Sequence, residues 1–148
     1  MSPLIEKKGE IIMTIQESLE KTQGRGPGFI NGASAKFAQM LLEEGENVDA
    51  AVTANIFTRK GHFPGVVAIT DRRVFAACGM PGIHRLQSLP LEELIHCAKS
   101  ESPLTWRFAF YTRNREFNIT VSPAVGKSLA PHVEKLRTRA AQKRAASA

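Results

Sequence analysis

The chain has few cysteines, few aromatic residues and no recognisable metal-binding spacing. Among 148 residues there are two cysteines, and Phe, Trp and Tyr together make up 7%. Cys78 and Cys97 form no CxxC pair and lie in apolar, strand-like runs, so we expect buried thiols rather than ligands or nucleophiles. The four histidines are scattered at spacings that match no zinc site. The sequence therefore predicts no metal and no cofactor.

Long apolar segments are also missing. No run approaches the roughly 20 residues that a membrane-spanning helix needs. The opening residues, MSPLIEKKGEII, lack the apolar core and the small-residue cleavage site of a secretory signal. Hydrophobic residues nevertheless make up 43% of the chain, which is sufficient for the core of one domain. These features predict a cytoplasmic protein without an integral membrane segment.

The chain carries a formal net charge of +6, and this charge is unevenly distributed. Residues 31–58 contain one basic and four acidic residues, whereas residues 59–133 contain ten basic and five acidic ones. Residues 134–148 add five basic residues against one acidic residue. This asymmetry favours weak electrostatic steering or self-association over a dedicated polyanion site.

The N-terminal third has helical spacing of its apolar residues. Residues 5–22 match a short amphipathic helix, and the glycine-rich and proline-rich residues 22–28 predict an irregular connection after it. A second helix is expected to begin near Asn31 or Ser34 and to stop at Gly45, with Phe37, Met40 and Leu41 on its apolar face. We therefore divide the chain into an N-terminal helix and linker (1–30), a main domain (31–137) and a basic, frayed tail (138–148).

From residue 48 onwards the apolar residues alternate with a period of two, as in half-buried strands. Seven strands are expected at 48–56, 65–70, 73–78, 84–89, 94–98, 104–111 and 117–121. In the last hairpin we expect the apolar side chains of residues 104, 106, 108 and 110 to share one face. A helix should begin at Pro123, kink or break near Ala130 because of Pro131, and lose its apolar stripe beyond Arg137.

These elements predict an α+β, mainly antiparallel β architecture, in which a curled seven-stranded sheet is capped by the C-terminal helix. Two segments carry a resemblance to a known family: GVVAITDRRVF at residues 65–75 and LPLEELI at residues 89–95. Together with the later hairpin and helix, they make residues 35–137 resemble the bacterial pleckstrin-homology-like (PH-like) domains.

The resemblance implies a non-catalytic binding or assembly scaffold. It implies a protein partner or self-association into a homo-oligomer. Eukaryotic relatives of this fold bind phosphoinositides through basic residues around the first two strands, and the matching positions here are Arg59 and Lys60, with His62 beside them. The second strand reads VVAI and supplies no further basic residue of that pattern.

Two classes of function remain from the sequence. The first is a protein-binding or self-assembling module that uses sheet edges or the N-terminal helices. The second is weak binding to an anionic membrane surface or to nucleic acid through Arg59–His62 and the basic tail. A basic strip formed by Arg107, Arg113 and Arg115 is the best candidate for nucleic acid. No arrangement of side chains predicts catalysis, since the adjacent Glu92 and Glu93 diverge and cannot flank one bond.

Overall fold

The computed structural model describes residues 5–7 and 10–147. Two short strands, β1 (Ile5–Lys7) and β2 (Glu10–Ile12), pair with each other and precede two helices. The helices are α1 (Ile15–Gln23) and α2 (Gly32–Leu41). The main sheet contains β3 (Val48–Thr58), β4 (Gly61–Thr70), β5 (Arg73–Met80), β6 (Ile83–Pro90), β7 (His96–Glu101), β8 (Trp106–Tyr111) and β9 (Glu116–Val121). A 3-10 turn, η1 (Leu91–Glu93), links β6 to β7, and α3 (Pro123–Ser147) ends the described chain.

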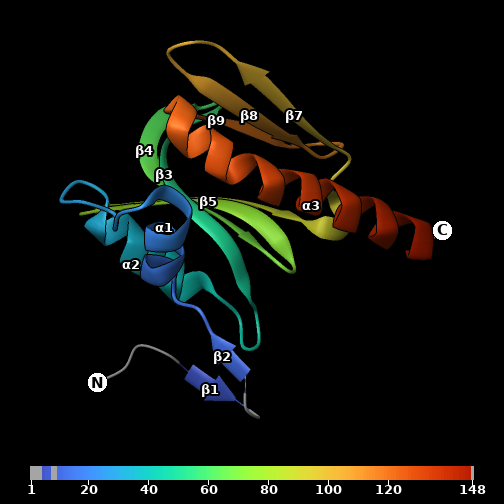
Figure 1. The fold of residues 1–148 in the computed structure, drawn as a ribbon, viewed down its shortest axis with the longest axis horizontal. Helices are drawn as coiled ribbons and strands as arrows, with labels where there is room; N and C mark the ends of the chain where they lie inside the picture. The colour runs from blue at the N-terminus through green and yellow to red at the C-terminus, as the bar shows by residue number, and fades with distance from the viewer. Residues whose placement is uncertain (1–4, 8–9, 148) are drawn as a thin grey trace.

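The seven strands form one antiparallel sheet in the order β6-β5-β4-β3-β9-β8-β7. The 11-residue β3 joins its two halves, because it pairs along its length with β4 and also pairs with β9 through Asn55, Ile56 and Phe57. The sheet curls around its own interior, and α3 lies across the opening (Figure 1). The predicted architecture is confirmed, and β6 and β7 are the two edge strands.

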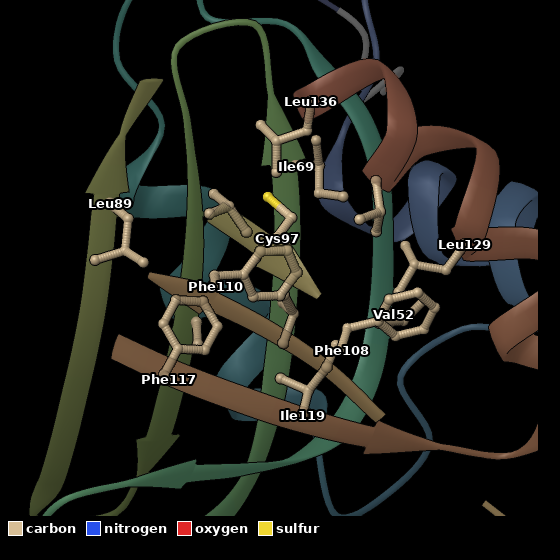
Figure 2. Packing of buried hydrophobic residues seen from close by; sticks show 14 of the residues in the cluster. Val52, Ile69, Leu89, Cys97, Phe108, Phe110, Phe117, Ile119, Leu129 and Leu136 are labelled. Atoms are coloured by element: carbon tan, nitrogen blue, oxygen red, sulfur yellow. The ribbon is translucent and has the colours of Figure 1, made fainter. Parts of the chain in front are cut away.

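The interior of the curled sheet is filled by aromatic and branched side chains. Phe108, Phe110 and Phe117 are almost fully buried there. Leu129 and Leu136 of α3 reach into the same cluster, so side chains from both halves of the sheet and from the helix meet (Figure 2). This packing explains why the helix stays on the sheet, since burying each large side chain contributes about 1.5–3 kcal/mol.

A second apolar layer lies on the outer face of β3, β4 and β5. Ile15 and Leu19 of α1 pack there with Val66 of β4 and Phe75 of β5. Both faces of β4 and β5 are therefore buried, and their sequences read as nearly continuous apolar runs for that reason. The helices α1 and α2 cover this face in Figure 1. The division at residue 30 stays a prediction, although α1 packs directly on the main sheet.

The N-terminal helix predicted over residues 5–22 is wrong in its first half. Helix α1 begins at Ile15 because Thr14 forms a capping box with Glu17, in which each side chain accepts a hydrogen bond from the other residue's backbone N–H. The preceding described residues form the β1–β2 pair. The spacing of apolar residues alone could not distinguish one continuous helix from a strand pair followed by a shorter helix.

The C-terminal helix also differs from prediction. It continues to Ser147 without a break at Pro131, whose ring lies on the exposed face, where water can satisfy the carbonyl left without a partner. The frayed tail at residues 138–148 stays a prediction, although Ala140 is buried and Arg139 pairs with Asp49 of β3. Two side chains placed on apolar faces by their spacing, Met40 and Leu104, are instead 81% and 87% exposed.

Candidate functional site

The turn between β3 and β4 carries the basic residues singled out from the sequence. Arg59 and Lys60 are exposed at its tip. The Thr58 hydroxyl donates to the Gly61 carbonyl and accepts from the Lys60 backbone N–H, which fixes the turn. Gly61 has a φ of 129°, a conformation that other residues rarely adopt. The two cations are thus held on a short, ordered hairpin tip.

A small aromatic and cationic cluster lies just behind that tip, on the outer face of the sheet. His62 stacks on Phe57 with ring centroids 5.4 Å apart. The Arg107 guanidinium lies 5.2 Å from the Phe57 ring centroid and donates to the Asn118 side chain at 2.9 Å. Phe57 therefore brings Arg107 to the hairpin that bears Arg59 and Lys60, a proximity that the sequence did not suggest.

The predicted basic strip is not continuous in the structure. Arg107 lies near the start of β8, whereas Arg113 and Arg115 lie in the turn after its end. Arg115 also pairs with Glu93 at 3.1 Å. The structure thus groups Arg107 with Arg59, Lys60 and His62, and leaves Arg113 and Arg115 elsewhere; a binding role for any of them stays a prediction.

A different site appears beside the edge strand β7. A cavity of about 390 Å³ separates the start of this strand from the C-terminal half of α3. We call it the β7–α3 groove, and it is lined by Leu94, Ile95, His96, Cys97, Glu134, Arg137, Thr138, Ala140, Ala141, Gln142 and Arg144. Apart from β8, no strand of the described chain pairs with β7, so one row of its backbone N–H and C=O groups is free to bind.

Several side chains of the β7–α3 groove are held by contacts within the chain. Arg144 donates to the Leu94 carbonyl, and Arg137 pairs with Glu134 at 2.9 Å. Burial raises the pKa of the Cys97 thiol to about 12, so the sulfur stays protonated and unreactive at neutral pH. Within the described residues, no three His, Cys, Asp or Glu side chains gather where they could hold a metal ion. This groove was not predictable from the sequence, because α3 was expected to fray beside it.

A buried ion pair lies near the other edge of the sheet, beside β6, and the sequence did not predict it. Glu46 accepts two hydrogen bonds from the Arg73 guanidinium, at 2.9 and 3.0 Å, and one from the Thr70 hydroxyl at 2.7 Å. Burial by itself raises the pKa of Glu46, but hydrogen bonds from Arg73, the Glu43 backbone and Thr70 hold this pKa below its usual value. Two of the acidic residues before β3 are thereby neutralised internally, because Arg72 also pairs with Glu43.

Comparison with known proteins supports the fold but no closer relationship. The solved structure of the Vps36 N-terminal PH domain is similar with a TM-score of 0.54 and 15% sequence identity, over 66% of this chain and 83% of that chain. No protein-family model matches the chain, and no curated protein matches it. Among the described residues, no helix is long and apolar enough to cross a membrane. The chain has a PH-like fold.

Proposed function

We propose that this protein is a non-catalytic module that binds an extended segment of a partner protein at β7. The main support is that β7 is an edge strand whose unpaired edge runs beside the β7–α3 groove. A peptide added to β7 would form main-chain hydrogen bonds, and its alternate side chains would enter the groove. A cavity of about 430 Å³ also touches the end of the other edge strand, β6, at Ser88 and Pro90, but most of the side chains that line it are charged and offer no apolar floor.

Three features of the groove support a peptide ligand. Leu94 and Ala140 give it an apolar floor, and both are almost fully buried. Arg137 and Arg144 place positive charge along the helix side; Glu134 offsets one of these charges, and the guanidinium N–H groups not used for Glu134 and the Leu94 carbonyl can donate to a peptide carboxylate or carbonyl. The protonated thiol of Cys97 adds no reactivity. This combination of apolar floor, cationic wall and free strand edge suits recognition and lacks the groups that a reaction would require.

Filling the groove tests the proposal. Peptides of about ten residues, the upper length of a typical strand, are selected on the immobilised wild-type protein from a random displayed library. Ala141 lines the groove and is exposed, so Ala141→Trp should block it without disturbing the core. Ala145→Trp, one turn further along the same exposed helix face, is the matched control.

We expect Ala141→Trp to weaken binding of the selected peptides at least about tenfold, and Ala145→Trp to leave it unchanged. Equal binding to wild type and Ala141→Trp would place the ligand outside the groove. A library that yields no peptide dependent on the open groove would contradict strand addition at β7.

A second candidate function is binding to an anionic surface through the hairpin tip. It is favoured by the grouping of Arg107 with Arg59, Lys60 and His62 around Phe57. Within the described chain, Arg59 and Lys60 form no ion pair, so their charges are available. Each cation near an anionic bilayer contributes about 1 kcal/mol, and the attraction weakens with salt.

Sedimentation with vesicles of phosphatidylcholine, with and without phosphatidylserine, tests this candidate at two salt concentrations. Arg59→Ala with Lys60→Ala should lower the partition coefficient about thirtyfold, since two contacts of about 1 kcal/mol are lost. The control, Arg113→Ala with Lys127→Ala, removes the same net charge from other exposed positions. An equal loss in both variants would show that only net charge matters, and stronger binding to a single-stranded oligonucleotide would favour nucleic acid instead.

A further inference from the structure

The loop between α1 and α2 presents two bulky apolar side chains to solvent. Phe29 is 102% exposed and Ile30 is 72% exposed, and we call this pair the knob. Only Leu104 and Met40 are comparably exposed among the large hydrophobic side chains described. Single exposed apolar side chains are common on monomers, whereas adjacent ones that form a patch are typical of interaction sites.

The loop that carries the knob is ordered by one side chain. The Gln23 amide nitrogen donates to the carbonyls of Arg25 and Gly26 at 3.2 and 3.1 Å. The Gln23 amide oxygen accepts from the Thr53 backbone N–H of β3 at 2.8 Å. The loop is therefore tied to the sheet, and little conformational freedom would be lost when the knob binds a partner.

An unfilled groove lies directly beside the knob. A cavity of about 700 Å³ runs between the two N-terminal helices, within the size range of ligand pockets. We call it the α1–α2 groove, and it is lined by Thr14, Ile15, Gln16, Glu17, Glu20, Pro27, Gly32, Ala35, Lys36 and Gln39. Pro27 and Gly32 flank the knob in sequence, yet the knob itself is too exposed to occupy the groove.

Charges around the knob and the groove are complementary. Arg25 lines a hollow together with Phe29 and Ile30, and it forms no ion pair within the described chain. Glu17 and Glu20 lie on the wall of the groove, where they outnumber its one basic side chain, Lys36. If a second copy placed its knob in this groove, its Arg25 would approach these carboxylates. An anionic membrane would instead be repelled by them, which disfavours a lipid surface as the occupant.

We propose that two copies of the chain associate through a two-fold axis, with the knob of each copy seated in the α1–α2 groove of the other. A surface that carries a projection next to a matching hollow is self-complementary under such an axis. Each knob would bury an aromatic anchor in a pocket, as is typical of the residues that dominate interface energies. This interface uses other elements than the β7–α3 groove, so self-association and peptide binding can fail independently.

Sedimentation equilibrium from about 1 µM to about 1 mM protein measures the association. The knob variant, Phe29→Ser with Ile30→Ser, loses both anchors of the symmetric pair, and its dissociation constant should rise about a thousandfold. The control, Leu86→Ser with Ile95→Ser, removes two exposed apolar side chains from β6 and from the segment before β7, and should dimerise like the wild type. A monomeric wild type, or a dimer that survives loss of the knob, would overturn the proposal.

A mixing experiment distinguishes this interface from non-specific association. Nothing lies within 4 Å of a Cβ added at Gly32, so Gly32→Trp should fold and block the groove. When Gly32→Trp is mixed with the knob variant, the knob of the first can still enter the open groove of the second. The heterodimer therefore keeps one of the two contacts, and it should be tighter than either homodimer. Circular dichroism and thermal melting establish that both variants are folded. Heterodimers no tighter than the two homodimers would refute reciprocal insertion.

Charge reversal gives a second, independent readout. Arg25→Glu should weaken the wild-type dimer, and adding Glu20→Arg to the same chain should restore it, because the reversed charges are again complementary. Both residues are exposed, so neither change disturbs the core. Failure of the second substitution to restore association would contradict the proposed juxtaposition.

Discussion

Replacing Arg73 with methionine tests how the structure accommodates the buried carboxylate of Glu46. The Glu46 side chain is fully buried, and Arg73 supplies two of its hydrogen bonds as well as the opposite charge. Removing one partner of a buried pair leaves an uncompensated charge and costs about 3–5 kcal/mol. That loss is a large part of the roughly 5–15 kcal/mol by which a domain of this kind is stable. Arg73→Met should therefore be severely destabilised at neutral pH.

The effect should depend on pH in a defined direction. In the wild type the pKa of Glu46 is lowered, so its contribution to stability is present above the unfolded-state pKa and is lost as the pH falls through the folded-state value. Without Arg73, burial remains and acts to raise the pKa, so the variant binds a proton more readily when folded. The difference in stability between wild type and Arg73→Met should shrink as the pH falls towards about 4.

Urea unfolding at neutral and acidic pH measures both quantities. Arg72→Met is the matched control, because Arg72 pairs with Glu43 at the surface, where such a pair contributes less than about 1 kcal/mol. A loss below about 1 kcal/mol for Arg73→Met, or a loss that does not change with pH, would refute the role given to the buried pair.

Three further predictions concern packing and titration. Gly126→Ala should destabilise the protein by about 1–3 kcal/mol and shift tryptophan fluorescence, because its Cβ would lie 2.6 Å from the Trp106 ring; unfolding curves with no change would contradict this. Cys97 should resist iodoacetamide at pH 8 in the folded protein and react after unfolding, as mass spectrometry can show, because its pKa is about 12. Burial lowers the pKa of His132 despite the attraction of Asp49, so folding stability should fall with pH below about 6.5, and His132→Gln should flatten that slope in urea titrations.

The alternating strands were predictable from sequence because a half-buried strand displays its own pattern. The alternation that includes Phe108 and Phe110 predicts the interior face of β8, and both side chains are buried there. The outer layer was harder to see, since β4 and β5 are apolar on both faces and their sequences do not say what covers the second face. Exposure of Leu104 was unpredictable for a related reason: it lies before the first residue of β8, where strand alternation no longer applies.

The candidate sites depended on long-range contacts, which local patterns do not encode. The pair formed by Glu46 and Arg73 joins residues 27 positions apart, and the β7–α3 groove joins segments still further apart. The grouping of Arg107 with the hairpin tip required Phe57 to lie between them. Ala140 continues the apolar stripe of α3, but a lone alanine among charged residues carries little hydrophobic signal.

Addition of a partner segment to the open edge of β7 would protect backbone amides of that strand. Amide hydrogen exchange, measured with and without a peptide selected on the wild-type protein, tests it most directly. We expect binding to slow exchange at alternate residues of β7 and in the adjoining part of α3, and to leave exchange at the β3–β4 hairpin tip unchanged. Slower exchange at Arg59 and Lys60, with β7 unaffected, would contradict the addition of a partner strand to β7.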